Sequence, residues 1–398
     1  MAPITLPFDL DLSRQAFEQS QDFTVGIEEE YAILNPHSLD LTPGFEELNS
    51  AAQNDPVLST SISGELISSE IEIRSGRGNN LSEAIQLQRE CRKRLFALAA
   101  DHDLALGSTG THPWSDYRDQ KIINTDHYRR VDQDLGYVAW RNNTFSTHVH
   151  VGIRGADRAV QVCERMRGVL PLLLAISANS PYLDGRDTRL HSARTQIFTR
   201  AFPRAGIPDP FANWGEYENY LNFLFQSKSI IEHTQVWWAV RPHPHFGTVE
   251  VRICDAQSTA QEAEALIALI VACVAQSARD QDAGVAKPTF AGGVRSLSAN
   301  VISENLWRAL RYGRQGSFIN LADNSEFPSD SALEVLLDWT EPVRAELEIH
   351  PQFPEYNGAQ RQLDMGRTGV SLREIYAQAV EENTSTRGAP TTPRQHST

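Results

Sequence analysis

Four stretches of this sequence alternate between apolar and charged residues, and they limit the fold more than any other feature of the chain. Side chains along a β-strand point alternately to its two faces, so each stretch predicts a strand with one apolar and one charged face. Antiparallel sheets carry such strands, because one face packs on the core while the other meets water. We therefore expect an α+β fold, in which an antiparallel sheet packs helices on one face and lines a charged cavity with the other. The charged faces carry Glu28 and Glu30; Glu70, Glu72 and Arg74; His148 and His150; and Glu250 and Arg252.

The first of these strands, Gly26 to Leu34, contains three consecutive glutamates. Glu28 and Glu30 share one face, whereas Glu29 points to the other. Two carboxylates on one face repel each other unless water or a cation separates them. This is therefore either an edge strand with a solvated acidic face or a source of ligands for a divalent cation, and the strand alone leaves both interpretations open.

Histidines and arginines on the other strands favour the second interpretation. Carboxylates with an imidazole suit Mg²⁺ or Mn²⁺, whose ligands are mainly hard oxygen atoms. Arginines suit phosphate oxygens. Further arginines gather in one irregular segment of an otherwise acidic chain, where they either contact an anionic ligand or pair with surface acids. Together these residues indicate metal–nucleotide chemistry. The segment carries Arg186, Arg189, Arg194, Arg200 and Arg204.

Charge and cysteine content exclude several classes of protein. The 398 residues carry a formal net charge of −15 and the sequence pI is about 5.3, unlike the basic surface of a nucleic-acid binder. The four cysteines are too far apart for a CxxC pair, and Met1 is not followed by a basic and apolar leader. The apolar runs at 169–176 and 265–275 are shorter than a bilayer span and predict buried helices. We expect a cytoplasmic protein with no nucleic-acid or membrane partner.

The pattern divides the chain into three parts. Residues 1–22 show little pattern and predict an N-terminal extension, residues 23–382 predict one domain, and residues 383–398 are rich in Ser, Thr and Pro and predict a disordered tail. Within the domain we expect helices at 82–101, at 157–179 with a kink at Pro171, at 215–232, at 259–280 and over most of 297–382; irregular segments at 35–60, 110–136 and 184–213; and a strand at 234–241.

Several well-known motifs are missing. The sequence has no GxxxxGK[ST], and Gly76-Arg77-Gly78 lacks the context of a dinucleotide-binding fold. HExxH and GxSxG are also absent. Two alternatives stay open: a zinc-dependent hydrolase, in which His148/His150 and His243/His245 hold Zn²⁺, and a non-catalytic protein of the same fold that binds metal or nucleotide.

Five short motifs occur in a specific order: Gly26-Ile27-Glu28-Glu29-Glu30-Tyr31, Glu70-Ile71-Glu72-Ile73-Arg74, Gly110-Thr111-His112-Pro113, Thr147-His148-Val149-His150-Val151-Gly152 and Thr248-Val249-Glu250-Val251-Arg252. This ordered set resembles the glutamate–cysteine ligase type 2 family, the bacterial carboxylate–amine ligases, over roughly residues 22–380. The resemblance implies a glutamine-synthetase-like fold, in which a curved antiparallel sheet holds metals and ATP on its concave face and packs helices on its convex face. Residues 23–382 would then form the ligase domain.

The resemblance also implies roles for individual residues. Arg252 would bind phosphate and take part in catalysis, Arg74 would help to bind the nucleotide, and Arg200, in Thr199-Arg200-Ala201-Phe202, would contact a substrate or phosphate. Glu70 and His148 would support the metal ligands. The Mg²⁺ (or Mn²⁺) ligands would be Glu28, Glu30, Glu72, His150 and Glu250.

The function implied by the resemblance is that of an ATP-dependent carboxylate–amine ligase with weak glutamate–cysteine ligase activity. The γ-carboxylate of glutamate, or of a similar acid, would take the γ-phosphoryl group of ATP to give an acyl phosphate and ADP. An amine, such as that of cysteine, would then displace phosphate and form an amide. The acid, the amine and the oligomeric state stay open, a homodimer included.

Overall fold

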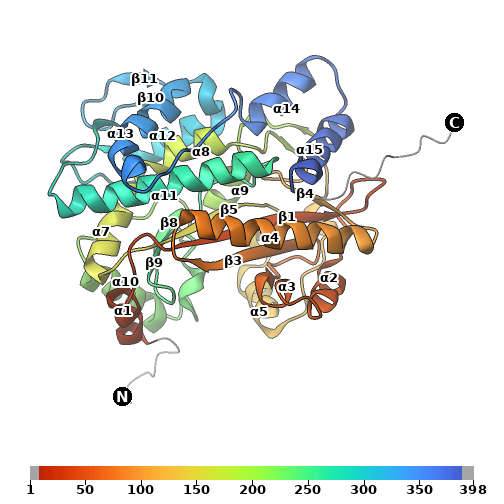
Figure 1. The fold of residues 1–398 in the computed structure, drawn as a ribbon, viewed down its shortest axis with the longest axis horizontal. Helices are drawn as coiled ribbons and strands as arrows, with labels where there is room; N and C mark the ends of the chain where they lie inside the picture. The colour runs from red at the N-terminus through yellow and green to blue at the C-terminus, as the bar shows by residue number, and fades with distance from the viewer. Residues whose placement is uncertain (1–8, 388–398) are drawn as a thin grey trace.

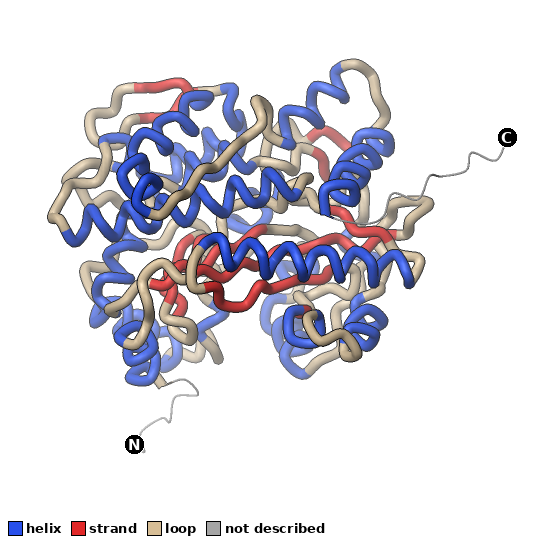
Figure 2. The backbone as a smooth tube through the Cα atoms, in the orientation of Figure 1, coloured by secondary structure: helices blue, strands red, loops and turns tan. Residues whose placement is uncertain are grey.

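A computed structural model describes residues 9–387. Its main sheet has the strand order β2-β3-β1-β5-β9-β8, with β4 also paired to β1, and every pairing is antiparallel. In Figure 2 these strands gather in the middle of the molecule and helices surround them. The strands are β1 (Val25–Leu34), β2 (Ile62–Ser63), β3 (Glu70–Gly78), β4 (Ala105–Gly107), β5 (Thr147–Gly152), β8 (Val240–His243) and β9 (Thr248–Val251); two small hairpins pair β6 (Tyr182–Leu183) with β7 (Arg186–Asp187) and β10 (Ser317–Ile319) with β11 (Glu326–Pro328).

Helices cover the apolar face of the sheet. In Figure 1, α4 lies along β1 and β3, and α11 runs beside it. Helix α7 packs against β8 and against α11, and a second layer of α8, α12 and α13 packs behind them. The α+β architecture expected from the alternating strands is therefore confirmed. The helices are α1 (Leu10–Glu18), α2 (Phe45–Ala52), α3 (Leu58–Ser61), α4 (Leu81–Asp101), α5 (Asp126–Leu135), α6 (Tyr137–Trp140), α7 (Ala156–Met166), α8 (Leu170–Ser177), α9 (Ala193–Ala201), α10 (Trp214–Gln226), α11 (Ala260–Asp282), α12 (Ala299–Tyr312), α13 (Ala332–Glu346), α14 (Gly358–Arg367) and α15 (Leu372–Arg387).

Side-chain caps fix where the two long central helices begin. The Glu83 backbone N–H donates to the Asn80 side chain at 2.9 Å, and the Glu262 N–H donates to Thr259 Oγ1 at 3.1 Å. Both helices begin where the sequence predicts. In the described part of the chain, α11 alone is long and apolar enough to cross a membrane, but 89% of its apolar window is buried against the rest of the protein.

Several segments predicted to be irregular contain helices. Helix α1 lies within the expected N-terminal extension, α2 and α3 lie within 35–60, α5 within 110–136 and α9 within 184–213. These helices are short and carry no long apolar stripe. Helices α2 and α3 have no side-chain cap. For α1, α5 and α9 the capping residues are the better signal. Side chains at their N-termini accept backbone N–H groups: Asp9 caps α1, Thr125 caps α5 and Ser192 caps α9.

Three other predicted boundaries are wrong. The helix expected at 215–232 ends at Gln226. The helix expected at 157–179 is broken into α7 and α8, and Pro171 lies in the first turn of α8, where a missing backbone N–H costs nothing. The strand expected at 234–241 begins only at Val240, after a 3₁₀ turn at His233–Gln235.

The C-terminal helix α15 extends five residues into the segment predicted to be disordered. Asn383 and Arg387 are buried, and Asn383 Nδ2 donates to the Leu106 carbonyl on β4 at 2.7 Å. The composition of the segment could not predict this hydrogen bond, because its partner lies 277 residues away in the sequence. Residues 388–398 of the predicted tail lie outside the described residues.

Gly78, at the end of β3, provides a test of this packing. A Cβ at this position would lie 2.5 Å from the Ala84 backbone nitrogen and 2.8 Å from its Cα, so β3 and α4 have no room for one. We expect Gly78→Ala to destabilise the protein by about 1–3 kcal/mol, as overpacking does. Chemical denaturation of both proteins measures this, and an unchanged free energy of unfolding would contradict the close approach of α4 to the sheet.

Candidate active site

The strand register places the charged residues of separate strands side by side. Glu28 on β1 lies opposite Arg74 on β3 and His148 on β5, so the three form one row across the sheet. In the next rows, Glu30 lies opposite Glu72, and His150 opposite Glu250. Because all these side chains leave the sheet on the face away from α4, they meet in one place.

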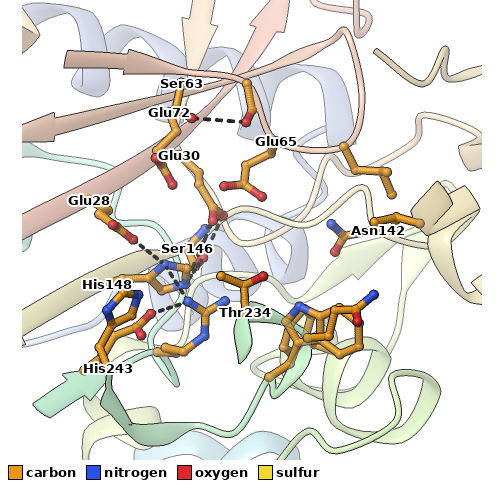
Figure 3. Close-up of a pocket in the computed structure, with 18 of the residues that line it drawn as sticks. Glu28, Glu30, Ser63, Glu65, Glu72, Asn142, Ser146, His148, Thr234 and His243 are labelled. Atoms are coloured by element: carbon orange, nitrogen blue, oxygen red, sulfur yellow. Dashed lines mark hydrogen bonds and ion pairs between the residues drawn. The ribbon is translucent and has the colours of Figure 1, made fainter. Parts of the chain in front are cut away.

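These rows line a cavity of about 420 Å³. Figure 3 shows the carboxylates of Glu28, Glu30, Glu65 and Glu72 pointing toward one another from different segments, with His148 beside them. All five predicted metal ligands lie on its wall, together with both supporting residues and two of the three predicted arginines: Glu28, Glu30, Glu72, His150, Glu250, Glu70, His148, Arg74 and Arg252.

At one end of the cavity, carboxylates crowd together without enough positive charge. Burial and the neighbouring charges of Glu28 and Glu65 raise the pKa of Glu72 well above its usual value. Burial and Glu30 raise the pKa of Glu65 to about 7. Glu70 shows the same direction of pKa shift, for the same reasons, and its Oε2 atom is buried without a hydrogen-bond partner. A cation is the missing partner that this end of the cavity can accept.

At the other end, the carboxylates are paired. Arg241 Nε donates to Glu250 Oε2 at 2.6 Å, and Arg252 Nη1 donates to Glu250 Oε1. Burial by itself would raise the pKa of Glu250, but Arg241 and Arg252 outweigh it and hold that pKa well below its usual range. For Glu28, burial is likewise outweighed by His150, so its pKa is also lowered. These two carboxylates are ionised and ready to act as ligands.

Two groups of possible metal-ligand atoms lie within the cavity, each with its atoms within 4.8 Å of one another. One contains Glu28, His148 and Glu250, and the other contains Glu30, Glu72 and His148. Donor sets dominated by carboxylate oxygens suit Mg²⁺ or Mn²⁺. The residues present therefore fit the divalent cations that the sequence analysis expects.

The two histidines differ in how their ring nitrogens are used. Both nitrogens of His148 have polar neighbours, since Nε2 lies 2.8 Å from Ser146 Oγ and Nδ1 lies 3.2 Å from Glu28 Oε2. His150 Nε2 is buried without a hydrogen-bond partner and lies 3.3 Å from Glu28 Oε1 and 3.9 Å from Glu250 Oε1. Both histidines therefore lie against carboxylates. His148, the predicted supporting residue, belongs to both groups of possible ligand atoms, whereas His150, the predicted ligand, belongs to neither.

Of the arginines, Arg252 and Arg74 face the cavity but Arg200 does not. Arg252 has only 13% of its side chain exposed, whereas the Arg74 side chain is 43% exposed and lies 3.5 Å from Glu72 Oε1. Arg200 is exposed on α9 and does not line the cavity. The predicted substrate contact of Arg200 is therefore not supported by its position. Arg194 lines the cavity; it lies six residues earlier on α9, which is about 120° around the helix.

A histidine-based zinc site has no support in the described residues. Each of the two groups of possible ligand atoms contains one histidine and two carboxylates. His243 lines the cavity, but its Nδ1 accepts the Phe246 backbone N–H at 3.3 Å.

A second cavity of about 650 Å³ adjoins the first and shares Glu28, Arg74 and His150 with it. Its lining includes several hydroxyl side chains and the exposed residue Phe246, with Arg77 as a further cation. Glu28 is its one acidic lining residue. This cavity is therefore less acidic than the first and leads away from the crowded carboxylates.

Sequence reasoning missed three residues that shape the site. Glu65 lies before β3, outside any alternating pattern. Arg241, which donates to Glu250, lies at the end of a predicted strand whose boundaries were wrong. Ser146 donates to Glu30 Oε2 through both its backbone N–H and its hydroxyl, at 2.5 and 2.6 Å. Glu65 lies in the loop that follows β2, directly after Gly64. This glycine was the one sequence signal that a loop carries Glu65.

Residues 24–383 match the family model described as glutamate–cysteine ligase family 2. The chain belongs to this family. A protein named "Putative glutamate–cysteine ligase 2" from Solibacter usitatus is 36% identical over 366 residues, covering 90% of this chain and 93% of the relative. "Putative glutamate–cysteine ligase 2-1" from Rubrobacter xylanophilus is 35% identical over 354 residues, covering 89% and 90% respectively. The family predicted from the five motifs is confirmed.

Solved structures share the fold of this family 2 chain. The glutamate–cysteine ligase of Francisella tularensis, in complex with AMP, has a TM-score of 0.66 at 13% identity and covers 94% of this chain and 91% of that chain. A bifunctional glutathione synthetase from Pasteurella multocida has a TM-score of 0.64 at 11% identity and covers 95% of this chain. The match covers 54% of the Pasteurella chain, so the present chain spans about half of it. The fold class implied by the resemblance is confirmed.

The crowding of carboxylates in this family 2 chain can be tested by a single substitution. The pKa of Glu72 is higher in the folded protein than in the unfolded chain. Above the ordinary pKa of glutamate the folded protein therefore binds a proton that the unfolded chain has released, and the stability of the folded protein falls as the pH rises. Glu72→Gln removes that cost, and we expect the melting temperature in EDTA at pH 7.5 to rise by roughly 1–3 °C. The gain should vanish near pH 4.

Glu250→Gln is the matched comparison, because Glu250 is paired with two arginines instead of being crowded by acids. It should lower the melting temperature under the same conditions, since it leaves buried guanidinium groups without their counter-ion. A fall in melting temperature with Glu72→Gln as large as that with Glu250→Gln would show that the carboxylates at the Glu72 end do not repel one another.

Proposed function

We propose that this protein is an ATP-dependent carboxylate–amine ligase that activates a carboxylic acid by phosphorylation. The observation that carries the proposal is the pair of carboxylate-rich ligand groups on one face of the sheet, bordered by Arg252. Family membership and the shared fold support the ligase class. Metal ions and arginines around a phosphoryl group are the recurring requirement of phosphoryl transfer.

We assign the cation-binding role to the predicted residues Glu28, Glu30, Glu72, His150 and Glu250. We add His148, which belongs to both groups of possible ligand atoms, and Glu65, whose carboxylate completes the crowded end. Bound Mg²⁺ or Mn²⁺ supplies charge neutralisation and orientation of the phosphates. Ser146 holds the Glu30 carboxylate through two hydrogen bonds, and Arg241 holds that of Glu250. These contacts keep both carboxylates aimed into the cavity.

The second cavity supports a place for the nucleoside part of ATP. It adjoins the ligand groups at Glu28 and His150, and its hydroxyl-lined walls with the Phe246 ring suit a ribose and a base. The triphosphate would then pass Arg74 and reach Arg252, whose planar fork suits phosphate oxygens. An AMP complex of the related Francisella enzyme agrees with nucleotide use by this fold.

The proposed acid is glutamate, through its γ-carboxylate, and the proposed amine is cysteine or a similar amine, as the names of the relatives suggest. The carboxylate attacks the γ-phosphorus, ADP leaves, and the amine then displaces phosphate from the acyl phosphate. No side chain needs to act as a nucleophile, because Arg252 and the metal-binding carboxylates supply positioning and charge stabilisation. Use of ATP is consistent with the cytoplasmic location expected from the sequence.

Isotope transfer tests this mechanism. With glutamate labelled with ¹⁸O in its γ-carboxylate, ATP, Mg²⁺ and a panel of amines, we expect ADP as a product and one labelled oxygen in the released phosphate. An acyl phosphate must pass that oxygen to phosphate when the amine displaces it. Amide formation with AMP, or with unlabelled phosphate, would rule out the mechanism, and no amide with any amine would favour a non-catalytic binding protein.

Arg252→Lys tests the phosphate contact. Lysine keeps the charge but lacks the planar fork that contacts Glu250 and would contact a phosphate. We expect a loss of kcat of about 10²-fold or more, as for removal of one group that stabilises a transition state, with a melting temperature close to that of the unchanged protein. Arg200→Lys is the matched control, since Arg200 does not line the cavity, and kcat should stay unchanged. An Arg252→Lys enzyme with normal kcat would remove this arginine from the mechanism.

A further inference from the structure

A buried ion network lies directly behind the candidate metal site. Glu29 lies between the two site carboxylates of β1 but turns to the helix-covered face, where it is 2% exposed. From α4, Arg92 Nε donates to Glu29 Oε2 at 2.6 Å and Gln88 Nε2 donates to the same oxygen at 2.8 Å. Arg387, the last residue of α15, is the third partner, with Nη2 3.6 Å from Glu29 Oε1. Nothing in the proposed reaction uses these groups.

Arg387 joins three separate parts of the molecule. Its side chain is fully buried, it donates to the Ser258 carbonyl at 3.1 Å and to the Gln257 carbonyl at 2.9 Å, and its guanidinium lies 5.4 Å from the centre of the Tyr31 ring on β1. It therefore ties the C-terminal helix both to β1 and to the segment between β9 and α11. The residue lies beyond the family match, which ends at 383.

The charges of this network match one another. Burial by itself would raise the pKa of Glu29, but Arg92 and Arg387 outweigh it and lower that pKa to about 2. Arg92 also donates to Glu264 Oε1 on α11 at 2.8 Å. Removing one member of such a network leaves a buried charge without its partner, which destabilises the arrangement that holds the remaining charge in place.

We infer that Arg387 is a positioning residue for the candidate metal site, acting through Glu29 to fix strand β1. Glu28 and Glu30 are the direct neighbours of Glu29 on β1, each about 3.3 Å away along the strand. A displacement of the Glu29 backbone therefore moves both of them. Metal ligands have to lie within about 0.2 Å of their preferred distances. Residues that hold ligands in place typically change metal affinity by about 10–100-fold when substituted. The inference rests on the proposed metal-dependent function.

Direct Mn²⁺ binding tests the inference without turnover. Calorimetric titration of the full chain with Mn²⁺, in the absence of nucleotide and substrates, is compared for the unchanged protein, Arg387→Lys and Arg387→Met. Lysine keeps the charge but cannot reach two carbonyls and Glu29 together. We expect Mn²⁺ affinity to fall about 10-fold or more with methionine and by less with lysine. Arg373→Gln on the same helix is the control: Arg373 is exposed, donates to the Ser38 carbonyl, and its loss should leave Mn²⁺ binding unchanged.

A second control separates positioning from loss of stability. Leu336 is fully buried on α13, which packs on α8 and α11 away from β1, so Leu336→Ala should lower the melting temperature without changing Mn²⁺ affinity. If both Arg387 variants bind Mn²⁺ as tightly as the unchanged protein, or if Leu336→Ala weakens binding as much, the inference is overturned while the proposed function stands. If the unchanged protein binds no Mn²⁺, the proposed metal site fails, and the inference fails with it.

Discussion

Repulsion among Glu30, Glu65, Glu70 and Glu72, all drawn into one cavity, is the constraint on which the rest of this structure depends. Burial and the neighbouring like charges raise the pKa values of Glu65, Glu70 and Glu72. The protein tolerates the crowding because the surrounding sheet is fixed on its other face by helices, whose packing stabilises the fold independently of the site. An arrangement that is unfavourable without a cation becomes favourable with one, and this is the physical argument for a metal centre.

Strand β1 carries charged side chains on both faces, and the two faces differ in how these charges are stabilised. Toward the cavity, Glu28 and Glu30 have histidine and serine partners and stay accessible to a ligand. Toward the helices, Glu29 accepts two hydrogen bonds and is ion-paired with two arginines, which is the condition under which a buried charge is stable. On the helix-covered face, the paired arginines fix the position of β1. On the cavity face, the crowded carboxylates of the site favour binding of a cation.

Much of this site could be predicted from the sequence, because strand alternation assigns faces without knowledge of the fold. The separation of Glu28 and Glu30 from Glu29 is confirmed, as is the shared face of Glu250 and Arg252. What could not be predicted depends on contacts across the chain. Glu65 enters the cavity from a turn, and Arg387 reaches Glu29 from the other end of the chain. Arg194, and not Arg200, lines the cavity. Both residues lie on α9, which was not predicted, and they point in different directions around this helix.

The distribution of charge along the cavity also constrains how a nucleotide would lie under the proposed function. The second cavity has Glu28 as its one acidic lining residue, so a base and ribose meet little repulsion there. A triphosphate entering past Arg74 and His150 runs toward Arg252 and the crowded carboxylates, where bound cations would be most needed. The terminal phosphoryl group would thus arrive where positive charge is greatest once metal is bound. Under the proposed function, the part of the first cavity that the second does not share, whose lining includes Arg194 and Trp237, is the space left for the acid to be activated.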